Sequence, residues 1–243
     1  EAETEIPPPA PRVFEREVRE LRDSARVFLR SEARHAAEAQ PVYLEASIGL
    51  APLPEGTELD VREAASLALP GGRTIQVRGR IDRVDRYADA RTDHVIWDYK
   101  TGSSASYRAP DPFDGGRRVQ TVLYAQLAQA RFQAIGRTDA RVVASGYCFA
   151  STRGYAERIA WPVPELAGGM AVVEALCRLM AAGCFPASPA AADYRYSEDW
   201  LPAFVDLDTT RTQAERKLAN PENELLQPLR AVRGNALPQT DDA

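Results

Sequence analysis

The most constraining feature of this chain is a pair of short β-rich runs that carry two aspartates and a lysine. Residues 77–87 and 94–100 are rich in β-branched and aromatic side chains, and residues 88–93 between them are turn-like. We expect the two runs to form an antiparallel hairpin centred near residue 90. In that register Asp82 and Asp98 lie almost opposite each other, and side chains opposite on one face are about 5 Å apart.

Lys100 is expected to lie beside these carboxylates. Side chains alternate along a strand, so Asp98 and Lys100 share a face and are roughly 7 Å apart along it. Two carboxylates that converge on one point repel each other unless a metal ion or a proton lies between them. An ammonium group next to them is suited to orienting a water molecule or to stabilising a developing oxyanion. The pattern therefore predicts a site for a hard cation with a lysine at its edge.

Three motifs carry a resemblance to a known family. The sequence contains G-R-I-D-R-V-D at residues 79–85, D-Y-K-T-G at 98–102 and Q-T-V-L-Y at 120–124. In this order they resemble the PD-(D/E)xK nuclease superfamily, and in particular its RecB-like branch, which includes the nuclease domains of bacterial recombination helicase-nucleases. A single D-x-K triplet arises often by chance, whereas three ordered motifs with fitting local structure are specific.

The resemblance implies metal-assisted hydrolysis of phosphodiester bonds. Asp82, Asp98 and the backbone carbonyl of Tyr99 are the expected ligands of Mg²⁺ or Mn²⁺, which prefer oxygen ligands. Lys100 is expected to position the attacking water or to neutralise charge on the phosphate. The resemblance leaves a further upstream ligand open: Glu45 and His35 are the candidates, and the histidine that relatives often supply either lies outside this sequence or has no equivalent in it.

Five other side chains have a predicted place. Gln120 and Tyr124 share one helix face, which alone is typical of an amphipathic boundary. The resemblance instead implies that they line the active site and hold the nucleic-acid strand. Glu45 resembles the acid of a family strand motif, E-x-x-F, and we expect it to have a structural or substrate-groove role. His35 is expected to be solvated, and His94 to lie in a loop.

The function that this resemblance implies is a metal-dependent DNA nuclease, expected to be an exonuclease, in DNA repair and recombination. Its substrate would be single-stranded DNA or a duplex end, and it is expected to work with a helicase domain or subunit. The alternative is a catalytically weak, nuclease-like DNA-binding scaffold in a helicase-nuclease complex. That alternative usually comes with loss of one of the aspartates or of the lysine. Asp82, Asp98 and Lys100 are all present here. The missing initiator Met suggests processing or a piece of a larger polypeptide.

The net charge of −5 is unusual for a nuclease, because binding to phosphates normally needs a basic surface. A local basic rim is expected from Arg78, Arg80, Arg83, Arg86, Arg117 and Arg118. We expect weak DNA binding by the chain alone, which a helicase that delivers the strand would offset.

The three cysteines, Cys148, Cys177 and Cys184, lack metal-ligand spacing and predict thiols in a reducing cytoplasm. Many relatives hold an iron–sulfur cluster with four cysteines, three of which follow a G-x-F-P segment. Residues 183–186 resemble that segment, but residues 191–200 contain no cysteine. Three cysteines cannot supply four thiolates, so no iron–sulfur cluster is expected.

Alternating elements predict an α/β fold, and the resemblance specifies a restriction-endonuclease-like core with a mixed central sheet flanked by helices. We expect a nuclease domain over residues 1–205 and a C-terminal helical extension with a disordered tail over 206–243. No apolar run approaches the roughly 20 residues that span a bilayer, so no membrane association is expected. Helices are predicted at 12–38, 117–134, 165–182 and 209–219, and further strands at 42–50, 141–150 and 155–161.

Overall fold

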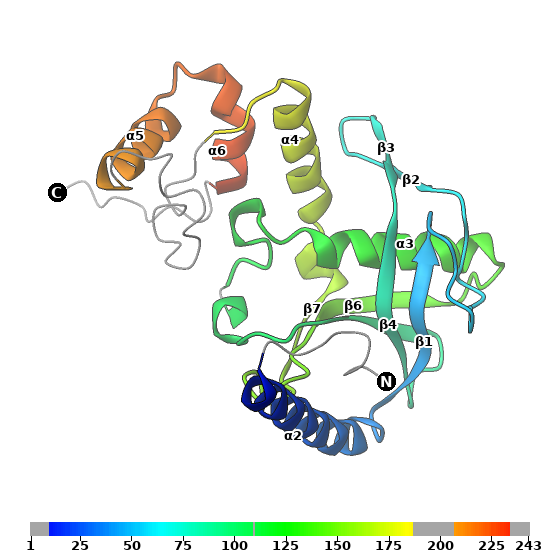
Figure 1. Ribbon diagram of the computed structural model, residues 1–243. Helices are drawn as coiled ribbons and strands as arrows, with labels where there is room; N and C mark the ends of the chain where they lie inside the picture. Colours follow the sequence, from blue (N-terminus) through cyan, green and yellow to red (C-terminus); the bar gives the residue numbers. More distant parts are fainter. Residues whose placement is uncertain (1–9, 109, 187–206, 234–243) are drawn as a thin grey trace. The chain divides into compact units, whose positions relative to one another are not determined.

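The computed structural model of the chain describes residues 10–108, 110–186 and 207–233 (Figure 1). The chain divides into two compact units. The first comprises Glu1–Ala68, Gly72–Pro112 and Gln120–Gly168. The second comprises Leu69–Gly71, Phe113–Val119 and Gly169–Ala243. Residues 191–200, where relatives carry the cysteines of a cluster, and the end of the predicted tail, residues 234–243, lie outside the described residues.

A five-stranded sheet forms the centre of the first unit. Its order is β1-β4-β5-β6-β7, in which only β5 and β6 run parallel. The strands are β1 (Ala39–Ile48), β4 (Gly79–Tyr87), β5 (Asp93–Tyr99), β6 (Arg141–Cys148) and β7 (Arg158–Pro162). A separate hairpin pairs β2 (Ala65–Ala68) with β3 (Thr74–Val77). The predicted mixed α/β fold is therefore confirmed.

The predicted motif hairpin is β4 and β5. Arg83 pairs with Trp97 and Val84 with Ile96 in antiparallel register. Continued by one residue, this register places Asp82 and Asp98 at facing positions. The hairpin forms here because both strands carry β-branched and aromatic residues that fit a buried, pleated surface.

Two helices cover the two faces of this sheet (Figure 1). On one face lies α3 (Gln120–Ala134), whose Phe132 ring contacts Tyr43 of β1 and His94 of β5. On the other face lies α2 (Pro11–His35), whose Phe28 packs on a buried cluster. That cluster consists of Val95, Trp97, Ala144 and Cys148. The β4–β5 hairpin that carries Asp82 and Asp98, called the carboxylate hairpin below, is thus held between two packed layers.

Charged contacts add to this packing and attach the C-terminal part of α2 to the sheet. None of its residues is fully buried. Glu32 forms ion pairs with Arg83 of β4, at 2.8 Å, and with Arg158 of β7. His35 Nε2 lies 3.0 Å from Asp85 Oδ2, and its side chain is 11% exposed. The prediction that His35 is solvated was wrong, because the fold places a buried carboxylate against the end of its helix.

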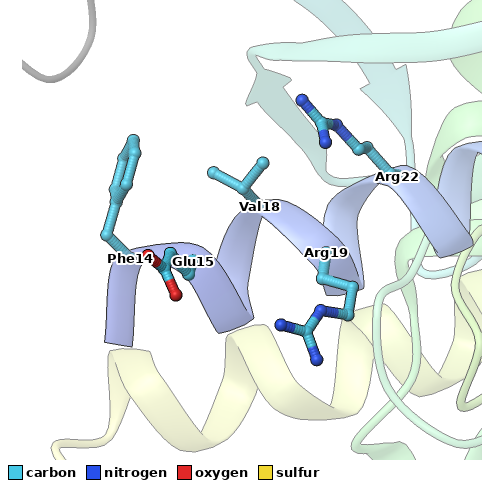
Figure 2. Close-up of a pocket in the computed structure, with 5 residues that line it drawn as sticks. All are labelled: Phe14, Glu15, Val18, Arg19 and Arg22. Atoms are coloured by element: carbon cyan, nitrogen blue, oxygen red, sulfur yellow. The ribbon is translucent and has the colours of Figure 1, made fainter. Parts of the chain in front are cut away.

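The N-terminal half of α2 also carries a shallow pocket of about 290 Å³. Figure 2 shows its side chains along one stretch of the helix. All of its lining residues belong to α2: Phe14, Glu15, Val18, Arg19 and Arg22. The pocket therefore shares no residue with the carboxylate hairpin.

The second unit contains α4 (Gly169–Ala181), α5 (Leu207–Ala219) and α6 (Gln227–Arg233). Leucines from these helices and the segment before α6 form its core: Leu179, Leu218, Leu226 and Leu229. Gly183, at a φ of +62°, ends α4 as predicted. The remaining helical segments are short 3₁₀ turns at Ala105–Arg108, Asp114–Gly116, Val163–Leu166 and Glu224–Leu226.

Several boundaries and the second histidine differ from the sequence expectations: α2 ends at His35 rather than at residue 38, β1 starts at Ala39 rather than at residue 42, and β7 starts at Arg158 rather than at residue 155. Helix α3 starts at Gln120 rather than at residue 117, because the backbone N–H groups of Arg117 and Arg118 bond back into the preceding turn. The helix predicted from residue 165 starts at Gly169, after a 3₁₀ turn that contains Pro164. His94 is a buried strand residue rather than a loop residue, and burial lowers its pKa. No helix in the described part of the chain is long and apolar enough to cross a membrane.

Candidate active site

The two motif aspartates are connected through the backbone of β5. Oδ2 of Asp82 accepts a hydrogen bond of 2.8 Å from the backbone N–H of Tyr99, the residue that follows Asp98. The carboxylate on β4 is therefore fixed against the end of β5. The two carboxylates are close enough that the charge of Asp82 raises the pKa of Asp98.

Asp98 lies at the centre of the cluster and is only 5% exposed. Its Oδ1 accepts a 2.6 Å hydrogen bond from Nε2 of Gln120. Its Oδ2 is buried and forms an ion pair of 2.5 Å with Nζ of Lys100. Burial raises the pKa of Asp98, and the adjacent Lys100 opposes part of that increase.

Helix α3 contributes its first turn to the same cluster. Nζ of Lys100 donates a 3.2 Å hydrogen bond to Oε1 of Gln120. Nε2 of Gln120 also lies 3.0 Å from the hydroxyl of Tyr124, one helical turn further on. The amide of Gln120 therefore connects the carboxylate of Asp98 with the ammonium of Lys100, since its two ends offer a donor and an acceptor.

Tyr147 of β6 is a neighbour that the sequence analysis missed. Its ring centre lies 5.3 Å from Nζ of Lys100, in a cation–π arrangement. The parallel pairing of β5 with β6 places Tyr147 beside Asp98. No local pattern indicates this contact, because it depends on how two separate strands align.

The first glycine of the motif makes room for α3. A Cβ atom on Gly79 would lie 3.3 Å from Cε1 of Tyr124. A contact of this length is tighter than ordinary packing. Gly79 therefore lets the side chain of Tyr124 come close to β4, beside the aspartates.

The donor set suits a hard divalent cation. Asp82 and Asp98 place two carboxylates close together, and hard divalent cations prefer such oxygen ligands. Among the described residues no group of three or more His, Cys, Asp or Glu side chains could together hold a metal. A Mg²⁺ site does not need three such side chains, because Mg²⁺ usually binds to one or two carboxylates and keeps several waters.

The other predicted residues lie outside the hydrogen-bonded cluster of Asp98, Lys100 and Gln120. Glu45 is exposed on β1 and has a left-handed backbone, with a φ of +54°. Arg83 was expected in a basic rim, but it is 2% exposed and bonded to Asp85, so this prediction was wrong. Arg117 and Arg118 belong to the second unit and form ion pairs with Asp114.

The fold and the cluster together define a class of protein. The five-stranded mixed sheet flanked by helices is consistent with a restriction-endonuclease-like core. A family model described as the PD-(D/E)XK nuclease superfamily matches residues 2–196. The chain therefore belongs to the PD-(D/E)XK nuclease superfamily. No curated protein is similar enough to the chain to count as a relative.

Proposed function

We propose that this chain is a Mg²⁺- or Mn²⁺-dependent deoxyribonuclease that hydrolyses phosphodiester bonds. The observation that carries the proposal is the shared hydrogen bonding of Asp98, Lys100 and Gln120 beside Asp82. An acid pair next to an ammonium group is suited to metal-assisted attack on a phosphate.

The carboxylates of Asp82 and Asp98, with the backbone carbonyl of Tyr99, would hold the cation. Nucleases of this superfamily typically use divalent metals such as Mg²⁺ or Mn²⁺. When bound, the metal supplies Lewis-acid polarisation of the phosphate and lowers the pKa of a water ligand. The closeness of the two carboxylates, at facing positions of β4 and β5, supports their role as ligands.

Lys100 would balance the charge of the phosphate and orient the attacking water, and Gln120 would position Lys100. Nζ of Lys100 would direct a donor toward the attacking water or a phosphate oxygen. Gln120 keeps Lys100 in place through its Oε1. The Tyr147 ring beneath the ammonium restricts it further without neutralising its charge.

The finer proposal is an exonuclease of the RecB-like type that acts in DNA repair and recombination beside a helicase. Its support is the D-Y-K-T-G and Q-x-x-x-Y motifs at residues 98–102 and 120–124. The net charge of −5 adds to this, because it gives the chain little general attraction for DNA. A helicase would bring the DNA strand to the site, which the surface charge of the chain does little to attract.

A cleavage assay with Lys100→Ala tests the proposal. The chain is incubated with end-labelled single-stranded and duplex DNA, with Mg²⁺, with Mn²⁺ and with EDTA. We expect metal-dependent cleavage that falls about 10²–10³-fold or more in Lys100→Ala, as for the loss of one transition-state donor. Products that shorten from one end would support the exonuclease assignment.

Lys217→Ala is the matched control, because Lys217 is the only other lysine of the sequence and is exposed on α5. It should cleave like the parent chain. Metal-independent cleavage, or a Lys100→Ala variant that is folded and fully active, would contradict the proposal. DNA binding without any cleavage by the parent chain would favour the scaffold alternative.

A further inference from the structure

The turn between β6 and β7, residues 151–157, has an unusual backbone. Tyr155 and Ala156 are consecutive and both have a φ of +53°. Tight turns with two left-handed residues favour Asn and Gly, which adopt this conformation at little cost. A tyrosine in such a position is strained, and an observed strained residue is a reason to look for a function.

The backbone of this turn is fixed by hydrogen bonds. Oγ of Ser151 accepts from the backbone N–H groups of Arg153 and Gly154, at 3.2 and 3.3 Å. The N–H of Ala156 donates to the carbonyl of Phe149 at 3.0 Å. A Cβ on Gly154 would come within 2.3 Å of Cβ of Phe149, so only glycine fits there. The turn is therefore a well-defined platform for the side chains that it exposes.

The same turn is bonded to the segment that directly follows Lys100. Oγ of Ser151 donates a 2.8 Å hydrogen bond to the carbonyl of Thr101. Glu157 accepts from Ser104 and forms a 2.7 Å ion pair with Arg108. The turn is therefore joined to the residues that directly follow Lys100. It is also joined to α2, because Oγ of Ser31 donates to the carbonyl of Ala156 at 3.3 Å and the N–H of Thr152 donates to Oγ of Ser24.

Two side chains of the turn are displayed to solvent. Tyr155 is 80% exposed, the largest value among the exposed large hydrophobic side chains of the described residues. Arg153 is exposed, and no carboxylate in the described ranges forms an ion pair with it. Packing does not require either group, since each points away from the core.

We propose that Tyr155 and Arg153 bind single-stranded nucleic acid beside the active site. The Tyr155 ring would stack on a base, because every base has a π face and such stacking tolerates any sequence. The Arg153 guanidinium would pair with a phosphate of the same strand. This inference rests on the proposed nuclease function, and it adds that the substrate strand is unpaired where it meets the turn.

Tyr155→Gly is the decisive variant. Glycine adopts a positive φ without strain, so this change removes the ring and leaves the protein at least as stable to denaturant. Binding is measured without divalent metal, by anisotropy, to a labelled single strand of about 20 nucleotides, which exceeds the roughly 4–16 nucleotide footprints of known single-strand sites. A strand of equal length that is abasic throughout provides the same phosphates without bases.

We expect Tyr155→Gly to bind the base-containing strand roughly 5- to 150-fold more weakly, the equivalent of one lost base stack. Its affinity for the abasic strand should not change. Tyr155→Phe should retain the stacking and bind like the parent chain. Leu29→Ala, at another exposed apolar residue (64% exposed), is the control and should have no effect.

Arg153→Ala should act differently. We expect it to weaken binding to the two strands by the same factor. It should also reduce the slope of log affinity against log salt by about 1, the signature of one lost phosphate contact.

Equal affinity of Tyr155→Gly and the parent chain for the base-containing strand would overturn the inference, and a protein partner would then be the better occupant of the turn. An equal loss on the abasic strand would also overturn it. The same preparations are assayed for metal-dependent cleavage. Cleavage with a KM for single strands that Tyr155→Gly leaves unchanged refutes only the inference. Tyr155-dependent binding without cleavage refutes only the proposed nuclease function.

Discussion

Glu45 adopts a left-handed backbone in the middle of β1, with a φ of +54°. It lies between the pairs Leu44–Arg83 and Ala46–Ile81, at the position that faces Asp82. An L-residue pays about 1–2 kcal/mol for this conformation. The side chain is exposed, so core packing does not explain why a residue other than glycine stands here.

We therefore predict that Glu45→Gly leaves the free energy of unfolding unchanged or raises it by up to about 1 kcal/mol. Cleavage should nevertheless fall, because the carboxylate expected in the substrate groove is gone. Glu45→Ala, which keeps the strain, should lose the same activity. Urea unfolding and a cleavage assay on both variants test this, and full activity in both would show that the carboxylate has no role.

Tyr43 gives a pH-dependent prediction. Burial, and then its hydrogen bond to Glu58, raises the pKa of Tyr43 to about 12, from an ordinary value of 10.0. A raised pKa means that the folded state keeps its proton while the unfolded state loses it. This contribution to stability is therefore complete below about pH 10 and is lost as the pH rises toward 12.

We predict that the stability difference between the parent chain and Tyr43→Phe shrinks by about 1 kcal/mol between about pH 9 and pH 11. Phenylalanine has no proton to release, so the subtraction isolates this one hydroxyl from the other tyrosines. Denaturant unfolding at the two pH values provides the measurement. A difference that stays constant would show that Tyr43 titrates normally in the folded state.

At the scale of single elements, α2 depends on Glu32. This carboxylate pairs with Arg83 and Arg158, whose side chains are only 3% and 13% exposed. Without Glu32, Arg83 keeps its contacts with Asp85, but the largely buried Arg158 loses its carboxylate, and such an uncompensated charge costs more than the pair contributes when intact. We predict that Glu32→Ala lowers the free energy of unfolding by about 2–4 kcal/mol. Glu20→Ala, at an exposed position on the same helix, should change it by no more than about 0.5 kcal/mol.

The same elements show where sequence reasoning succeeds. The β4–β5 hairpin could be predicted with its register, because a short turn and two β-rich runs define it locally. The first turn of α3 could be placed at the site through its motif, since Gln120 and Tyr124 lie one helical turn apart. Contacts between distant segments could not be predicted. Tyr147 reaches Lys100 only through strand pairing, and Arg83 is buried only because α2 covers it.

At the scale of the whole molecule, the net charge of −5 limits DNA affinity. We predict dissociation constants in the non-specific range, about 10⁻⁴–10⁻⁶ M at physiological salt, for the chain alone. Only a few phosphate contacts are expected, so the salt slope should be shallow, at about one unit per contact. Anisotropy titrations over a range of salt concentrations measure both quantities. Nanomolar affinity at physiological salt would contradict this prediction.

The contact of Glu32 with Arg158 also sets an order of assembly. These residues are 126 positions apart in the sequence, whereas the bond from Tyr99 to Asp82 spans only 17. Short loops close at a lower entropic cost than long ones, and a chain is synthesised from its N-terminus. The carboxylate hairpin can therefore close early on the ribosome. Helix α2 is synthesised before the hairpin, but its Glu32 gains Arg158 as a second ion-pair partner only once β7 has emerged. The helix is therefore fixed to the sheet after the hairpin has closed.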